Sequence, residues 1–280
     1  MSLTPALLLL ADSRLPAGGH AHSGGMEAAT VAGLVGDEHS LEGFLRGRLA
    51  TAGLASAGLA AAACRHASEV AAGAPACWAG LDAEAAARTP SPAQRTAARV
   101  QGRALLRAAR AAWPHPVLDS LVMASGQVAD PAAGGPAAPC HPVVLGACAW
   151  ITGGTPGDAA LISATAAITG PASAAIRLLG LDPLTVTGLL ARLGPETAAV
   201  AAHAASAAEH GATGTTATGT TGTGITGTGT PGTGTPGTGT PGTGTTASGT
   251  RWAALPAPAS PGLDLLAERH AQEEVALFES

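Results

Sequence analysis

The sequence predicts an all-α protein, and two observations point to this fold class. The chain has 280 residues, of which 46% are apolar but only 2% are aromatic, and it contains no tyrosine. Most of the apolar residues are alanine, the strongest intrinsic helix former, whereas strands favour β-branched and aromatic residues. In addition, no stretch of useful length alternates between apolar and polar residues as a strand does. We therefore expect a single-domain bundle of closely packed helices lined by alanine and leucine.

Glycine and proline divide the chain into candidate helices. Asp37 or Ser40 is suited to cap the third of these helices, and Pro92 fits the first turn of the fifth. Pro195 is expected to begin a new helix in the same way. The predicted helices span approximately 4–11, 23–36, 39–70, 74–87, 91–113, 116–129, 141–153, 157–169, 171–180, 182–193, 195–209 and 262–278.

One segment differs sharply from the rest in composition. Residues 211–250 are mainly glycine, threonine, alanine and proline, and the pattern TPGTG recurs within them. Without large apolar side chains, such a segment cannot offset its ordering entropy by burial. We expect a disordered, flexible insertion at 211–250. It would separate a helical domain at 1–210 from a C-terminal helix and tail at 251–280 that complete the same domain.

Charge and cysteine content exclude several classes of function. The net charge is −5, and all 14 basic residues are arginine. The absence of lysine excludes a P-loop lysine and a Schiff-base lysine, and a mildly acidic chain argues against nucleic-acid binding. The four cysteines lack CxxC spacing, which indicates free thiols, mostly in the core, in a reducing compartment. The apolar run ALLLL is too short for a signal sequence or a membrane span. We therefore expect a cytoplasmic protein without a membrane or nucleic-acid partner.

The helix predicted at 91–113 carries a stripe of arginines. They repeat at helical spacing and fall within a sector of roughly 120°, whereas Gln101 lies on the opposite, apolar side and is expected to pack there. Two interpretations stay open: a solvated face paired with carboxylates of the same domain, or a contact surface for an acidic protein partner. The stripe consists of Arg95, Arg99, Arg103, Arg107 and Arg110.

The stretch ADSRLPAGGHAHSGGMEAA, residues 11–29, is rich in glycine and histidine between two apolar runs. Pro16 is expected to end one helix and Ser23 to cap the next, while the glycines permit positive φ angles. Glu27 would lie in the first turns of that second helix, where a carboxylate is favoured. The stretch lacks the preceding strand and the lysine of phosphate-binding loops. We expect it to form an exposed, preorganised corner.

Histidine and cysteine side chains raise two alternatives that involve a metal. A nickel-binding metallochaperone could use His20, His22, Cys140 and His141, because imidazole and thiolate groups ligate nickel and zinc. A metal-dependent hydrolase could be built on the pair His20 and His22. However, the flanks of this pair are helical, and no GxSxG motif or nucleophile–base pair is visible. The sequence therefore predicts no catalytic residue, no resident metal and no cofactor.

LLLADSRLPAGGHAHSGGMEAA closely resembles the N-terminal signature of the urease accessory protein UreF family. Further segments resemble this family in the same order: RVQGRALLR at 99–107, HPVVLGACA at 141–149, SAAIRLLGLDPLTVTGLLARL at 173–193 and the closing DLLAERHAQEEVALFES. The resemblance implies an all-α, noncatalytic protein that binds UreD (also called UreH), as a homodimer within the accessory complex. It also implies recruitment of the nickel-carrying GTPase UreG and support of nickel insertion into apo-urease.

Positions that match the family motifs are the partner-binding residues that the resemblance implies. His20 stands where the family usually has phenylalanine or tyrosine, so a titratable group replaces an aromatic anchor. The implied residues are Asp12, Ser13, Pro16, Gly18, His20, His22, Ser23, Gly25 and Glu27 in the corner, Gln101, Gly102 and Arg103 in the arginine-rich helix, and Arg177, Leu277 and Phe278.

Overall fold

The computed structural model describes residues 4–12, 14–16, 22–125, 138–213 and 251–272, which form helices and connecting loops without a strand. The predicted all-α class is therefore confirmed. Most of the segment expected as an insertion, from 214 to 250, lies outside the described residues. The elements are α1 (Pro5–Ala11), α2 (Met26–Val31), α3 (Glu38–Arg48), the π-helical η2 (Leu49–Gly53), α4 (Leu54–Ala71), α5 (Trp78–Ala87), α6 (Pro92–Ala112), α7 (Pro116–Ser125), α8 (His141–Ile151), α9 (Pro156–Leu179), α10 (Pro183–Thr213) and α11 (Pro261–His270).

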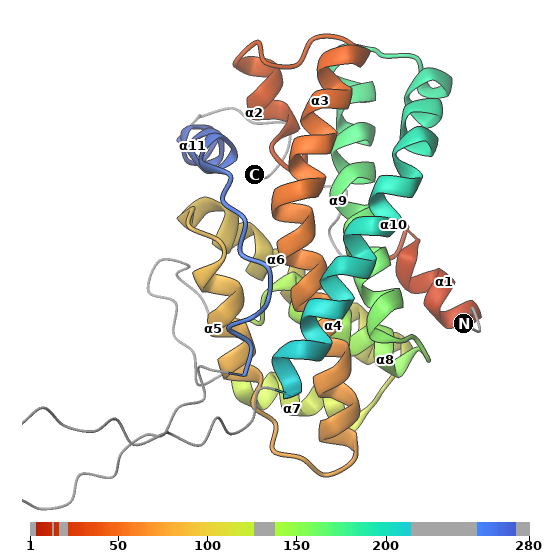
Figure 1. The fold of residues 1–280 in the computed structure, drawn as a ribbon, viewed down its shortest axis with the longest axis vertical. Helices are drawn as coiled ribbons and strands as arrows, with labels where there is room; N and C mark the ends of the chain where they lie inside the picture. The colour runs from red at the N-terminus through yellow and green to blue at the C-terminus, as the bar shows by residue number, and fades with distance from the viewer. Residues whose placement is uncertain (1–3, 13, 17–21, 126–137, 214–250, 273–280) are drawn as a thin grey trace, which may run out of the picture.

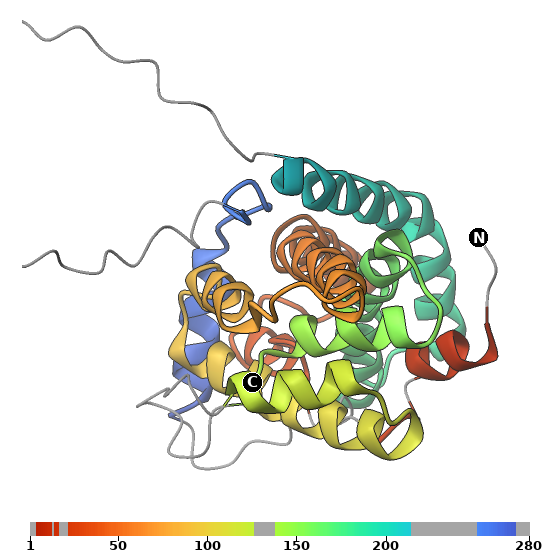
Figure 2. The same cartoon turned by 90° about the horizontal axis from the view of Figure 1, so that it is seen from below.

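Helix α4 is the centre of the fold. Figures 1 and 2 show it enclosed by α8, α9 and α10 together with the shorter helices, and Figure 2 shows it end-on. Its alanines at 60–63 are fully buried. The crossing with α8 is so close that a β-carbon on Gly146 would lie 2.1 Å from the carbonyl oxygen of Ala60. Small side chains therefore let the helix backbones approach closely, as the composition predicted.

The long helix predicted at 39–70 exists as one continuous helical rod from α3 through η2 to α4 (Figure 1). Its start carries a reciprocal capping box, in which Asp37 accepts a hydrogen bond from the backbone of Ser40 and the Ser40 hydroxyl accepts one from the backbone of Asp37. The predicted capping residues are thus confirmed. The π-helical segment at 49–53 was not predicted; such single-turn bulges lie within otherwise regular helices.

Two predicted helix breaks are wrong, because α9 passes through Pro171 and α10 passes through Pro195. A proline inside a helix removes the hydrogen bond to the carbonyl four residues earlier. For Pro171 that carbonyl belongs to Ala167, and it accepts a hydrogen bond at 3.0 Å from Nε of Arg48 instead. A side chain from α3 therefore replaces the missing backbone donor in α9.

Among the described helices, α9 alone has the length and composition of a membrane span. However, 56% of its most apolar stretch is buried inside the molecule, and it packs against α4, α10 and α8. That burial is the pattern of a helix in a protein core.

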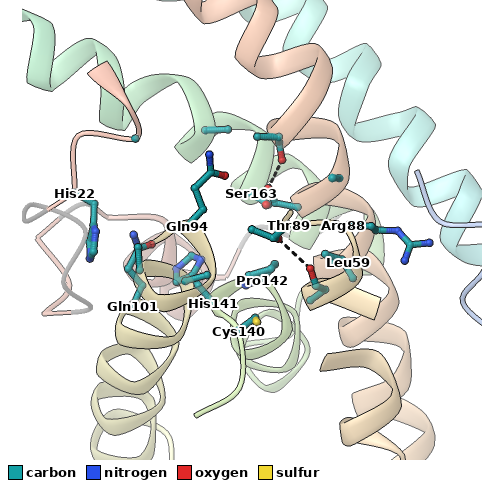
Figure 3. A pocket seen from close by; sticks show the side chains of 18 of the residues that line it. His22, Leu59, Arg88, Thr89, Gln94, Gln101, Cys140, His141, Pro142 and Ser163 are labelled. Atoms are coloured by element: carbon teal, nitrogen blue, oxygen red, sulfur yellow. Dashed lines mark hydrogen bonds between the residues drawn. The ribbon is translucent and has the colours of Figure 1, made fainter. Parts of the chain in front are cut away.

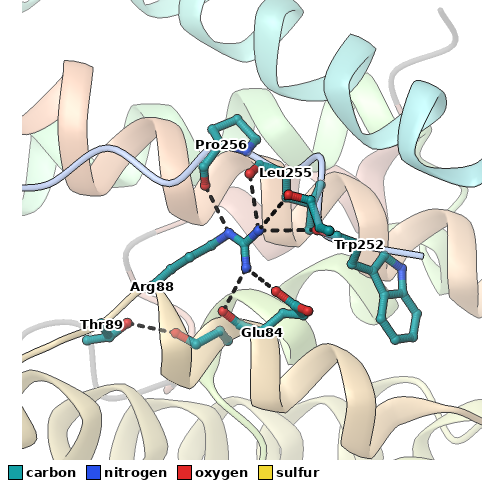
Figure 4. A network of polar contacts seen from close by, with 8 residues as sticks. Glu84, Arg88, Thr89, Trp252, Leu255 and Pro256 are labelled. Atoms are coloured by element: carbon teal, nitrogen blue, oxygen red, sulfur yellow. Dashed lines mark hydrogen bonds and ion pairs between the residues drawn. The ribbon is translucent and has the colours of Figure 1, made fainter. Parts of the chain in front are cut away.

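Residues 251–256, which we call the C-terminal strap, lie across α4 and α5. Arg88, at the end of α5, donates from Nε to the carbonyl oxygen of Pro256 (3.1 Å) and from Nη2 to those of Trp252 (3.2 Å) and Leu255 (3.1 Å), as Figure 4 shows. The opposite edge of its guanidinium pairs with Glu84. The strap leads into α11, which packs on α6 and α2. One arginine thus joins the C-terminal residues to the helices of the first half of the chain.

Candidate functional site

The polar side chains that lead from the corner into α2 are buried, contrary to the prediction that the corner is exposed. His22, Ser23 and Glu27 have 7%, 0% and 6% of their surface exposed. Helix α2 begins with Gly25 as its N-cap, at a φ of 86°. Ser23 still accepts a hydrogen bond at its hydroxyl from the backbone of Glu27, at 3.3 Å. The predicted helix therefore exists, but it is shorter than expected, and the prediction that Ser23 caps it is wrong because Gly25 is the N-cap. Pro16 does not end the preceding helix either, since α1 ends at Ala11.

Two contacts explain why the corner is buried. The carboxylate of Glu27 lies 3.3 Å from Nε2 of the buried His270 on α11. A β-carbon on Gly24 would lie 2.9 Å from Pro171 and 3.1 Å from Nη2 of Arg48. Gly24 also has a φ of 62°, which favours glycine. The corner is therefore docked onto α9 and α3 through Gly24, which was not among the predicted site residues, and onto α11 through Glu27.

The first residues of the corner are more accessible. Pro16 is exposed, and Asp12 is partly exposed at the end of α1. Hydrogen bonds from the side chain and backbone of Arg14 lower the pKa of Asp12 to about 2, so this carboxylate remains charged at neutral pH. Three residues implied by the family resemblance, Ser13, Gly18 and His20, lie outside the described residues.

The arginines of α6 do not form one exposed stripe. Arg99 is buried, and its Nη1 donates to Asp82 at 2.9 Å and to the carbonyl oxygen of Ala138 at 2.6 Å. Arg110 forms an exposed ion pair with Asp119. Arg103 and Arg107 are exposed. Intramolecular pairing, the first of the two interpretations, therefore holds for Arg99 and Arg110.

Gly102 is where α6 meets the residues that precede α8. A β-carbon at this position would lie 2.0 Å from the carbonyl oxygen of Pro139 and 3.0 Å from the backbone nitrogen of His141. The same junction is fixed by Asp82, which accepts a hydrogen bond at 2.7 Å from the backbone of Cys140. Gly102 thus allows α6 to pack closely on the residues that begin α8. It would affect partner binding only indirectly, by keeping these two helices in place.

A cavity of about 240 Å³ lies behind the corner. Figure 3 shows His22, Gln101 and His141 on one side of it and Arg88 directed away on the other. Burial, followed by the nearby His22, lowers the pKa of His141 to about 4, so its imidazole is neutral at pH 7. Gln101 is partly buried on the cavity wall. The structure therefore brings together residues that are more than a hundred positions apart in the sequence.

The histidines and cysteines do not form an evident metal centre. His22, Cys140 and His141 line the same cavity, but the described residues contain no group of three or more His, Cys, Asp or Glu side chains that could hold a metal ion. All four cysteines are free, and three are buried, as predicted. Burial raises the pKa of Cys64 and of Cys148 to about 12. Those two thiols are therefore protonated and poor metal ligands.

Of the remaining implied residues, Arg177 alone lies within the described part of the chain. Arg177 is exposed in the last turn of α9. Leu277 and Phe278 lie outside the described residues.

Comparison with known proteins identifies the family. The family model UreF matches residues 35–194 of this chain. Urease accessory proteins UreF from Mycobacterium sp. (strain JLS) and from Mycolicibacterium vanbaalenii are each 44% identical over 205 residues, which is 73% of this chain and 87% of theirs. The UreF of Mycobacterium marinum is 43% identical over the same length. The chain belongs to the UreF family. The region matched by the UreF model runs from the loop after α2 into α10, so it includes α6 and most of the cavity wall.

Proposed function

We propose that this chain is a noncatalytic accessory protein of urease maturation. It assembles with UreD (UreH) and with the GTPase UreG, as a homodimer within the accessory complex, and supports nickel insertion into apo-urease. The observation that carries the proposal is membership of the UreF family, whose curated relatives are named urease accessory proteins and align with most of this chain.

The surface of the structure supports a role in binding proteins. Of the residues implied by the family resemblance, Pro16, Arg103 and Arg177 are exposed. Arg103 shares the exposed side of α6 with Arg107, and cationic arginines favour an acidic partner surface. His22, Ser23, Gly25, Glu27 and Gly102 support the proposal indirectly, because they shape the scaffold that carries this surface.

The proposal is tested by co-purification of the chain with its UreD and UreG homologues. We expect Arg103→Glu to weaken the complex at least tenfold, because it reverses a charge at the interface, while it shifts the melting temperature little because Arg103 is exposed. Arg192→Glu is the matched control, since Arg192 is also exposed, with 61% of its side chain accessible, but lies on α10. Loss of stability without loss of binding in Arg103→Glu would instead indicate a purely intramolecular role.

A second candidate function is transport of nickel by this chain itself. It is favoured by the placement of His22 and His141 on one cavity, where the neutral imidazole of His141 could ligate a metal. Calorimetry with Ni²⁺ decides between the two. Saturable micromolar binding that His22→Ala and His141→Ala abolish would support transport, and its absence would leave the assembly role alone. The hydrolase alternative has no structural support, because the described residues contain no strand to carry a His-x-His pair.

A further inference from the structure

We propose that the cavity behind the corner is a binding site for a small monocarboxylate, held by the guanidinium group of Arg48. The cavity has a volume of about 240 Å³. Because one water occupies about 30 Å³ in the liquid, this space accommodates an anion of several non-hydrogen atoms. The site concerns the chain alone and does not depend on its urease partners.

Arg48 is a partly buried cation on the cavity wall without a carboxylate partner among the described residues. Its single hydrogen bond within that part of the chain runs from Nε to the carbonyl oxygen of Ala167, which Pro171 leaves without a backbone donor. This bond anchors the guanidinium group and leaves Nη1 and Nη2 available. Desolvation by burial alone lowers the pKa of Arg48 to about 10. A cation in such surroundings is stabilised when an anion joins it.

The rest of the cavity wall also favours an anion. Among the described residues that line it, none is aspartate or glutamate. Three acids from neighbouring elements are already engaged, Asp82 with Arg99, Glu27 with His270 and Glu84 with Arg88. The N-terminus of α8 reaches the wall at His141, where its backbone dipole adds positive potential. Besides the two arginines and Cys140, the polar side chains among the described lining residues are His22, Ser56, Thr89, Gln94, Gln101, His141 and Ser163.

Charge and geometry select a monocarboxylate over other anions. Arg88 is the other arginine on the wall, but its guanidinium is fully occupied by Glu84 and the C-terminal strap (Figure 4). One available positive charge matches one negative charge. The planar fork of a guanidinium group pairs with the two oxygens of a carboxylate, whereas a phosphate dianion would lack a second counter-charge.

Occupation of the site would stiffen the corner. Arg48 lies against Gly24, and His22 lines the same cavity, so an anion between them would join the corner to α3 and α8. If the corner supports UreD binding, as proposed above, the carboxylate would strengthen that binding; this second step rests on the proposed function.

The site is tested with the purified full-length chain and ¹³C-labelled acetate as the probe, at constant ionic strength with chloride as the balancing anion. We expect saturable binding in calorimetry and in NMR titration of the probe. Arg48→Gln should weaken it roughly tenfold or more, the loss of a charge-assisted pair. The control Arg192→Gln, which removes an exposed arginine outside the cavity, should bind acetate as the wild type does. Inorganic phosphate should bind more weakly than acetate.

A second background separates anion binding from the structural role of Arg48. Pro171→Ala restores a backbone donor for Ala167, so Arg48→Gln should destabilise this background less than the wild type, yet still abolish the response to acetate. Absence of saturable binding up to about 100 mM acetate, equal binding by Arg48→Gln in a folded protein, or tighter binding of phosphate would each overturn the proposal. Because no urease protein is present, these outcomes do not depend on the proposed function.

Discussion

At the scale of single residues, glycine is required where two backbones meet without room for a side chain. Gly102 and Gly146 both occupy such positions, the first against Pro139 and the second against Ala60. Gly43, within α3, has no atom near the position of a β-carbon. Glycine is therefore needed for close helix packing at Gly102 and Gly146, whereas at Gly43 it only lowers the helix propensity.

We expect Gly102→Ala to destabilise the protein by about 1–3 kcal/mol or more, the cost of overpacking a close contact. Gly43→Ala is the matched control and should be neutral or stabilising by up to about 1 kcal/mol, because alanine is the better helix former. Urea unfolding of both variants checks the prediction. Equal stability of the two variants would show that α6 and the 139–141 segment are not in contact.

The protonation of His141 predicts how stability depends on pH. Its pKa in the folded protein is lowered to about 4 from a reference value of 6.5. Between these two pH values the unfolded chain therefore binds a proton at this imidazole that the folded protein does not bind. Stability from this group is fully present above about pH 6.5 and is lost as the pH falls toward 4. Burial also lowers the pKa of His66, which acts in the same direction.

We therefore expect the free energy of unfolding to fall as the pH is lowered from 6.5 to 4. His141→Gln should make the slope of this fall smaller, by the contribution of at most one bound proton. Urea unfolding at a series of pH values measures both slopes. His210→Gln is the control, since His210 is exposed. An unchanged slope in His141→Gln would mean that this imidazole binds a proton as readily in the folded protein as in the unfolded chain.

Residue roles were only partly predictable from the sequence. The capping pair Asp37 and Ser40 could be predicted because capping is local. Arg99 and Arg103 could not be distinguished, because they share one helical stripe and only the fold places Asp82 beside Arg99. The role of Arg48 could not be predicted either, because it depends on Pro171, which lies more than a hundred residues away in the sequence.

At the scale of elements, helix starts were predicted better than helix interruptions. Thr155 and Asp158 form a reciprocal capping box at the start of α9, with Asp158 accepting from the backbone of Thr155 at 2.8 Å and Thr155 accepting from that of Asp158 at 3.2 Å. Within the same helix, Pro171 causes no break because a distant side chain replaces the missing donor. The residues next to a helix start indicate the cap, whereas the residues next to Pro171 do not reveal the distant donor that keeps the helix continuous.

We expect Thr155→Ala to destabilise the protein by about 0.5–2 kcal/mol through loss of the cap. Thr169→Ala on the exposed side of α9 is the control; its hydroxyl bonds only to the carbonyl of Thr165 within the helix, so its loss should be nearly neutral. Thermal unfolding of the two variants checks the difference. A neutral Thr155→Ala would show that the start of α9 frays without consequence.

At the scale of the whole molecule, the C-terminal strap is held on the bundle by three of the side chains that it contacts. Arg88 donates to four carbonyl groups of the strap, Arg251 pairs with Glu69, and Trp252 is buried beside His66. The sequence predicted a C-terminal helix after the low-complexity segment, but its packing partners could not be predicted because they are long-range contacts.

We expect Arg88→Gln to release the strap and to accelerate tryptic cleavage after Arg251, because the strap carbonyls lose their common donor. Arg95→Gln is the control, since Arg95 donates to Thr89 and Pro90 near the same turn without touching the strap. Mass spectrometry of the fragment that begins at Trp252 measures the rate. Equal cleavage of the two variants and the wild type would contradict the fastening role of Arg88.

We propose that this UreF-family chain acts in urease maturation by assembling other proteins, without chemistry of its own. The most direct measurement is urease activity and nickel content in cells that lack this chain but express urease and the remaining accessory proteins. We expect inactive, nickel-poor urease, restored by the wild-type chain and poorly restored by Arg103→Glu. Full activation of urease in the absence of the chain would contradict it.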